Sequence, residues 1–185
     1  MKITVFGASS PQANSPAYQF AYRLGQQVAK SGHTVITGGY MGTMEAVSRG
    51  AAEMNGHVIG VTCAEIEKWR NASANHWVKE EWRKESLQDR ISALINECDA
   101  AIALPGGPGT LAEIVLMWNK IQIQAIPEKP IILMGSGWKK VMQTLFLEQN
   151  EYISETYKQW LYFTESVEEA ILLLPETQRT INTQK

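Results

Sequence analysis

A glycine-rich turn at residues 105–110 is the part of this sequence whose residue types and spacing are best suited to chemistry. The apolar segment 99–104 runs into the turn, and a helix is predicted to start within it. Glycines expose main-chain N–H groups, and the start of a helix adds unpaired donors and the positive end of its dipole. We expect the turn to bind a phosphate, the alternative being a tight connection that binds nothing. The expected phosphate-binding residues are Pro105, Gly106, Gly107, Gly109 and Thr110.

An acidic residue stands beside this expected anion site. Glu113 follows Thr110 by three residues, and a carboxylate close to a phosphate is unfavourable unless a cation intervenes. Arg90, one predicted helix upstream, is the candidate cation, although it also fits an ordinary helix-surface arginine. Glu113 also fits a capping box, because Thr110-x-x-Glu113 is the pattern in which two side chains satisfy backbone donors at a helix start. The spacing alone leaves both alternatives open.

Two further turns of small residues follow predicted strands and are candidates for the same ligand. Neither matches the dinucleotide fingerprint G-x-G-x-x-G after the first strand, and the chain has no Walker sequence, which disfavours NAD and ATP. The candidate ligand-binding residues in these two turns are Gly7, Ser9, Ser10, Gly38, Gly39, Gly42 and Thr43.

The elements that must position these residues alternate along the chain between strands and helices. The patterns predict strands at 2–6, 34–37, 57–61, 99–104, 130–134 and 160–163. They predict helices at 16–31, 44–54, 80–96, 110–124, 138–149 and 167–174. This alternation predicts a Rossmann-like α/β fold, a doubly wound parallel sheet flanked by helices, as a single domain over 1–175. Ligands of such sheets bind beyond the carboxyl ends of the strands, where the three turns would converge.

Three segments have a different character. Residues 62–77 are polar without a clear period, and we expect either a lid over a pocket or an ordinary excursion. The basic cluster from Lys79 to Arg90 alternates with acidic residues and is typical of a solvated helix face. Residues 176–185 are mostly polar and are expected to form a flexible tail.

Composition and charge exclude several classes of protein. The 185 residues are 44% hydrophobic and 19% charged with a net charge of −2, which suits a globular domain and argues against a dedicated nucleic-acid partner. No apolar run is long enough for a membrane span or a secretory segment, so we expect a cytoplasmic protein without a membrane partner. The two cysteines and three histidines have no ligand spacing, so no metal is predicted.

The run from Leu104 to Glu113 matches the signature PGGxGTxxE, and the chain therefore resembles the LOG family. Members of this family were long described as possible lysine decarboxylases and are now associated with cytokinin riboside 5′-monophosphate phosphoribohydrolases. The resemblance extends from the opening strand with its turn at 7–10, through Gly38 and Gly39 and the segment 57–61, to about Met134.

The resemblance implies a Rossmann-like homodimer that needs no metal or redox cofactor. It implies that Arg90 and Glu113 are the catalytic pair, and that the activity is hydrolysis of the N-glycosidic bond of a nucleoside 5′-monophosphate. The wider clan also includes molybdenum cofactor carrier proteins, so the alternative is a non-catalytic carrier of a phosphorylated pterin. Met117 and Trp118, on the helix after the glycine turn, are candidates for packing a dimer or higher homo-oligomer.

The chain departs from the family pattern in two places. Where the family usually has GGGxxGLMG, this chain has one residue fewer and Tyr40 in place of a glycine. Where the family usually reads MHxRK, residues 87–91 read LQDRI, which keeps Arg90 and loses the methionine, histidine and lysine. Both departures fall where a substrate would be recognised.

Overall fold

Seven strands and eight helices alternate along residues 1–175, which are the residues that the computed structural model describes. The tail expected at 176–185 lies outside the described residues. The strands are β1 (Lys2–Phe6), β2 (Thr34–Thr37), β3 (Val58–Cys63), β4 (Glu80–Lys84), β5 (Ala100–Ala103), β6 (Ile131–Met134) and β7 (Leu161–Thr164). The helices are α1 (Pro16–Lys30), α2 (Thr43–Glu53), α3 (Ala64–Arg70), α4 (Leu87–Asn96), α5 (Pro108–Gln122), α6 (Ser136–Glu148), α7 (Glu155–Lys158) and α8 (Val167–Leu172).

All seven strands lie in one parallel sheet of order β4-β3-β2-β1-β5-β6-β7. The chain builds outward from β1 to β4 on one side, returns to the centre, and builds outward from β5 to β7 on the other. Strand order therefore reverses between β1 and β5, which is where open parallel sheets place their ligands. The predicted doubly wound Rossmann-like fold is confirmed.

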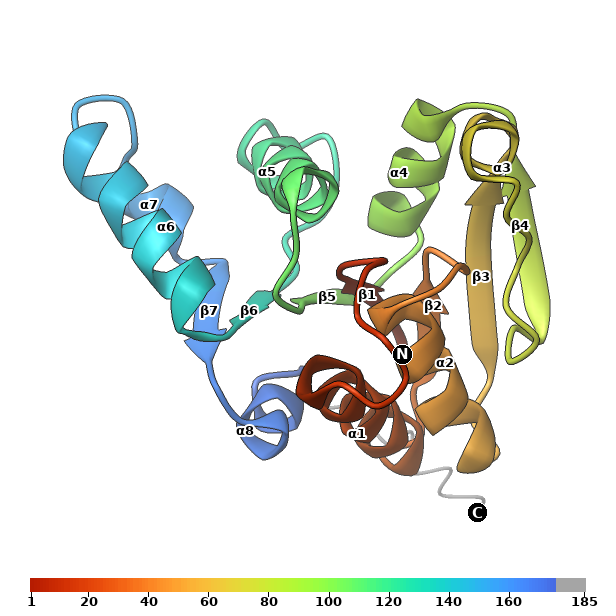
Figure 1. Ribbon diagram of the computed structural model, residues 1–185. Coiled ribbons are helices and arrows are strands. Elements are labelled where there is room, and N and C mark those ends of the chain that lie inside the picture. Colours follow the sequence, from red (N-terminus) through yellow and green to blue (C-terminus); the bar gives the residue numbers. More distant parts are fainter. Residues whose placement is uncertain (176–185) are drawn as a thin grey trace, which may run out of the picture.

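Helices cover both faces of the sheet, so the central strands are buried on both sides and are almost wholly apolar. Helices α1, α2 and α8 pack on one face and α4, α5 and α6 on the other, as Figure 1 shows. The two layers correspond to two apolar clusters, one around Leu24, Val35 and Val47 and the other around Ile59, Met117 and Trp118. No helix within residues 1–175 combines the length and apolar character needed to cross a membrane.

The predicted helix at 80–96 is wrong in its first third, because Glu80–Lys84 forms the edge strand β4 and pairs with β3 on one side. An edge strand exposes one side, so it carries alternating charged residues that also fit a solvated helix face. The helix begins only after Ser86, whose hydroxyl accepts a hydrogen bond from the Asp89 amide as the N-cap.

Two other predictions are corrected by the packing. The irregular segment expected at 62–77 contains the helix α3, and β3 extends to Cys63. Met117 and Trp118 do not face a second copy, because they are 0% and 7% exposed in the core of the protein. The Trp118 indole N–H donates to the Tyr157 carbonyl at 2.6 Å, which fixes the ring inside the fold.

Candidate functional site

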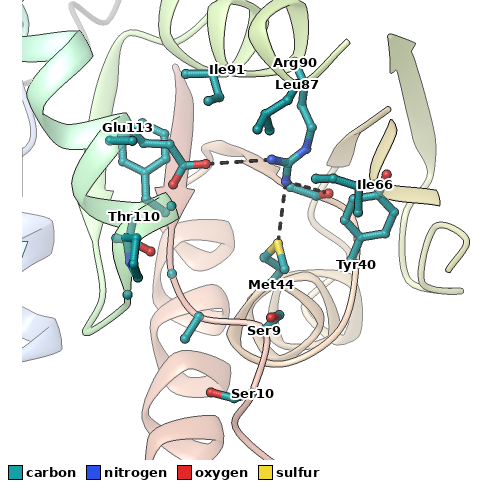
Figure 2. Close-up of a pocket in the computed structure, with 18 of the residues that line it drawn as sticks. Ser9, Ser10, Tyr40, Met44, Ile66, Leu87, Arg90, Ile91, Thr110 and Glu113 are labelled. Atoms are coloured by element: carbon teal, nitrogen blue, oxygen red, sulfur yellow. Dashed lines mark hydrogen bonds and ion pairs between the residues drawn. The ribbon is translucent and has the colours of Figure 1, made fainter. Parts of the chain in front are cut away.

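A cavity of about 480 Å³ opens at the carboxyl ends of β1, β2 and β5, beside the point where strand order reverses. Residues of all three predicted turns line it, as the sheet topology led us to expect, and their binding of one ligand stays a prediction. Figure 2 shows Arg90 and Glu113 on one side of the cavity and Ser9 and Ser10 on the loop opposite. The predicted residues that line it are Gly7, Ser9, Ser10, Gly38, Arg90, Gly107, Gly109, Thr110 and Glu113.

Arg90 is buried, and main-chain carbonyl groups hold its guanidinium in place. Nε donates to the Val61 carbonyl at 2.7 Å, and Nη2 donates to the Gly38 carbonyl at 3.2 Å. The guanidinium carbon lies 5.5 Å from the centroid of the Tyr40 ring, and Nη2 lies 3.9 Å from Met44 Sδ. Arg90 is only 6% exposed, so it is not the surface arginine that its position near the start of α4 also allowed.

Gly38 is required by this arrangement. A Cβ atom at this position would lie 1.9 Å from Arg90 Nη2 and 2.5 Å from Met44 Sδ. Because the strand end must approach the guanidinium so closely, any side chain at position 38 would displace the arginine.

Glu113 faces Arg90 from α5, with 3.9 Å between Oε1 and Arg90 Nη1. The residue is 8% exposed, and burial raises the pKa of its carboxyl to about 7, although the charge of Arg90 acts in the opposite direction. The capping-box alternative is wrong, because Gly107 is the N-cap of α5 and no side chain caps this helix. Glu113 is therefore an acid directed at the cavity that can lose or keep its proton near neutral pH.

The start of α5 presents main-chain donors to the cavity. Pro108 occupies the first turn, where its missing N–H costs nothing, and Gly107 and Gly109 have open space where a Cβ would stand. With no side-chain cap, the amide groups of this first turn remain available to an anion. The Thr110 hydroxyl lies close behind Gly106, whose Cβ would approach it to 2.2 Å.

The loop after β1 is fastened to the start of α2. Both the Thr43 amide and its hydroxyl donate to the Ala8 carbonyl at 2.9 Å. Gly42, with φ of 74°, allows this approach, since a Cβ there would lie 2.5 Å from the same carbonyl oxygen. The contact holds Gly7 and Ser9 at the rim of the cavity.

Five predicted ligand-binding residues are not part of the lining. Gly42 and Thr43 fix the first loop, and Gly39 packs closely against β3, where a Cβ would approach the Gly60 Cα to 3.3 Å. Pro105 and Gly106 are exposed at the beginning of the third turn but do not line the cavity. These five positions, namely Gly39, Gly42, Thr43, Pro105 and Gly106, shape the turns that carry the lining residues.

Several lining residues were not among the sequence candidates. Tyr40 is 2% exposed, and its hydroxyl both donates to the Cys63 carbonyl and accepts from the Cys63 amide. The only sequence signal for it was the departure from the glycine of the family pattern. Helix α3 and the start of α4 supply five more side chains that were missed, which are Ile66, Trp69, Arg70, Leu87 and Ile91.

The cavity combines the ionisable pair of Arg90 and Glu113, the main-chain amides at the start of α5, which can bind an anion, and a wall of apolar side chains. Residues 1–175 contain no cluster of three or more histidine, cysteine or acidic side chains placed to hold a metal ion. The groups that face a ligand here include Glu113, Arg90, Arg70, the loop hydroxyls and the main-chain amides.

The fold and this cavity define a Rossmann-like α/β protein with an arginine–glutamate pair at the switch point of its sheet. A model of the SLOG cluster4 family matches residues 1–170, and the chain belongs to this family. The resemblance to LOG proteins that the signature indicated is confirmed by relatives of that name.

Two relatives and one solved structure illustrate the similarity. The chain is 34% identical to a probable cytokinin riboside 5′-monophosphate phosphoribohydrolase of Oryza sativa over 72% of its own length and 54% of that protein, about half of the rice chain. It is 26% identical to the cytokinin riboside 5′-monophosphate phosphoribohydrolase of Mycobacterium tuberculosis, covering 91% and 90% of the two chains. The molybdenum cofactor binding protein of Rippkaea orientalis superposes with a TM-score of 0.72 at 26% identity, covering 93% of each chain.

Proposed function

We propose that this protein hydrolyses the N-glycosidic bond of a nucleoside 5′-monophosphate, giving the free base and ribose 5-phosphate. The observation that carries the proposal is the buried ion pair of Arg90 and Glu113 in the wall of the cavity. Relatives named as phosphoribohydrolases, at 24–34% identity, support the same reaction class.

The phosphate of the substrate is assigned to the start of α5. Amide groups at 107–110 would bind its oxygens, and the hydroxyls of Ser9 and Ser10 would complete the site from the loop opposite. The apolar wall formed by Ile66, Leu87 and Ile91 suits the base. This placement leaves the sugar between the phosphate site and Glu113.

The reaction breaks the bond between the anomeric carbon and the base nitrogen and forms a bond from that carbon to a water oxygen. Positive charge develops on the sugar, and the ionised Glu113 would stabilise it electrostatically and orient the attacking water. One proton of the water passes to the Glu113 carboxylate, which then releases it to solvent, and the departing base nitrogen takes up a proton from solvent. Arg90 would keep Glu113 in place and offset the repulsion between its carboxylate and the phosphate.

The test is base release from a panel of nucleoside 5′-monophosphates by the parent protein and by Glu113→Gln. The variant removes the ionisable group at nearly constant shape, so turnover should fall at least about a hundredfold while substrate affinity stays within a few fold. Glu151→Gln, an exposed glutamate outside the cavity, is the matched control and should retain full activity. Equal rates for Glu113→Gln and the parent would show that the catalytic assignment is wrong.

The second candidate is a non-catalytic carrier of a phosphorylated pterin such as the molybdenum cofactor. It is favoured by the superposition on the Rippkaea orientalis molybdenum cofactor binding protein over 93% of both chains. A carrier would release no base from any nucleotide in the panel, yet its ligand would raise the melting temperature. Base release and thermal stabilisation measured on the same samples therefore separate the two functions.

A further inference from the structure

The carboxyl end of α3 adds a cation and an aromatic ring to the cavity. Trp69 and Arg70 both line it, and Trp69 is 74% exposed. The guanidinium carbon of Arg70 lies 4.5 Å from the centroid of the Trp69 ring, within the range of a cation–π contact. Arg70 Nη1 donates a hydrogen bond of 2.8 Å to Ser9 Oγ, in the loop after β1. The guanidinium is thus held beside Ser9, at the edge of the same cavity that the start of α5 lines.

Within the described residues, Arg90 has an acidic partner and Arg70 has none. Arg90 pairs with Glu113 and donates to two main-chain carbonyls, so its donors are largely occupied. None of the ion pairs formed among residues 1–175 includes Arg70. In the cavity, Arg90 is therefore already hydrogen-bonded within the protein, whereas the charge of Arg70 can pair with a bound phosphate.

We propose that Arg70 binds the phosphate group of the ligand, with the Trp69 ring orienting its guanidinium plane toward the loop that carries Ser9. The inference rests on the proposed function only in that the ligand is a phosphate monoester. It makes α3 the element that distinguishes phosphorylated from unphosphorylated ligands.

The physical basis is that a helix start alone is a weak partner for a phosphate dianion. The start of α5 offers amides and a partial positive charge, and Glu113, when ionised, offsets the charge of Arg90. A guanidinium can donate two parallel hydrogen bonds to phosphate oxygens, and it stacks on an aromatic ring more readily than an ammonium does. Arginine next to tryptophan is therefore suited to close the anion site.

The experiment compares the affinity of each common nucleoside 5′-monophosphate with that of its nucleoside by isothermal titration calorimetry. It is done in the Glu113→Gln background, so that no turnover occurs, with Arg70→Ala, Arg70→Lys and Lys68→Ala added singly. Lys68 is exposed, lies on the same helix and does not line the cavity, which makes it the matched charge control.

We expect Arg70→Ala to weaken monophosphate binding about tenfold to a hundredfold and to leave nucleoside binding within about twofold. Arg70→Lys should recover part of the loss, because it restores the charge without the paired donors. Lys68→Ala should bind monophosphates and nucleosides with the same affinity as Glu113→Gln alone. Added salt should weaken monophosphate binding more steeply when Arg70 is present.

Three results would overturn the inference. The first is that the protein with Arg70 intact binds no monophosphate more tightly than the corresponding nucleoside. The second is that Arg70→Ala leaves the monophosphate affinity unchanged. The third is that Arg70→Ala weakens nucleoside and monophosphate binding equally, which would give Arg70 a purely structural role. Because this experiment measures binding, it is independent of base release. If the protein binds monophosphates more tightly through Arg70 but releases no base, the proposed hydrolase activity is wrong and the role of Arg70 still holds.

Discussion

At the scale of single residues, the Glu113 carboxyl couples the site to pH. Its pKa of about 7 in the folded protein lies above the ordinary value of 4.5, so the folded state binds the proton more tightly than the unfolded state. Stability from this group is fully present below pH 4.5 and is lost as pH rises through about 7.

Glu113→Gln should therefore gain stability relative to the parent as pH rises from about 4.5 to about 7, with little further change above. The full shift corresponds to a relative gain of about 3 kcal/mol, and the loss of the partner of Arg90 reduces it. Urea denaturation across this pH range measures the difference. Glu151→Gln should show no such trend, and a difference for Glu113→Gln that does not vary with pH would contradict a raised pKa.

Gly38→Ala tests how closely the strand end must approach Arg90. The added Cβ would lie 1.9 Å from Arg90 Nη2, so the guanidinium must move and activity should fall at least about tenfold. Gly137→Ala, in α6, meets nothing within 4 Å and should keep full activity with stability unchanged or about 0.5–1 kcal/mol higher. Rates of base release with circular dichroism spectra check both variants, and normal rates for Gly38→Ala would show that the position of Arg90 is not critical.

At the scale of elements, Lys129 secures the end of the helix that carries Arg90. The residue is 8% exposed, and its ammonium donates to the carbonyls of Ile95, Asn96 and Cys98 at the carboxyl end of α4. These carbonyls have no helical partner of their own, so Lys129 supplies hydrogen bonds that the buried helix end requires.

Lys129→Met should lower the free energy of unfolding by about 2–3 kcal/mol, because it removes the ammonium donor from carbonyls of which, within residues 1–175, only that of Ile95 retains another contact, the Cys98 thiol. Lys120→Met removes an ammonium that donates an exposed hydrogen bond to the Asn96 side chain, and its cost should stay within about 0.5 kcal/mol. Urea denaturation at one pH compares the two. Equal small losses would show that water replaces the Lys129 contacts.

The sequence patterns predicted most elements of the sheet because buried parallel strands and amphipathic helices leave clear periods. Residues 34–37 form a strand with the predicted bounds, and the three turns follow strands as expected. Strand β4 was missed because an edge strand with charged residues has the same composition as a solvated helix face. Helix α3 was missed because none of its residues is buried, which leaves no apolar stripe to detect.

The part of the site that could be predicted from the sequence is the part whose residues lie close together in the chain. The glycine turn and Glu113 lie within ten residues of one another in the chain, and both line the cavity. Arg70 and Tyr40 could not be found in this way, because their roles depend on contacts with Ser9 and Cys63 that are distant in sequence. Folding alone brings these pairs together.

At the scale of the whole molecule, we expect two copies to associate, as the family resemblance implies. Helix α5 exposes Leu111, Val115 and Leu116 at 38%, 40% and 37%, which supports its outer face as the contact surface. Light scattering after gel filtration should give a dimer mass for the parent and a monomer mass for Leu111→Glu combined with Val115→Glu. Leu147→Glu, at a 70% exposed position on α6, is the control and should leave the mass unchanged. A monomeric parent would refute the expected assembly.

The way in which Arg90 is anchored has a consequence for how the surrounding loops can evolve. Its two shortest hydrogen bonds end on the main-chain carbonyl oxygens of residues 61 and 38, which do not depend on side-chain identity as long as position 38 stays glycine. Substitutions elsewhere in the neighbouring loops can therefore reshape the cavity without removing the acceptors that orient the guanidinium. Tyr40, which stands where the family pattern usually has a glycine, is at such a position, so the ligand that the cavity accepts can change while Arg90 keeps its orientation.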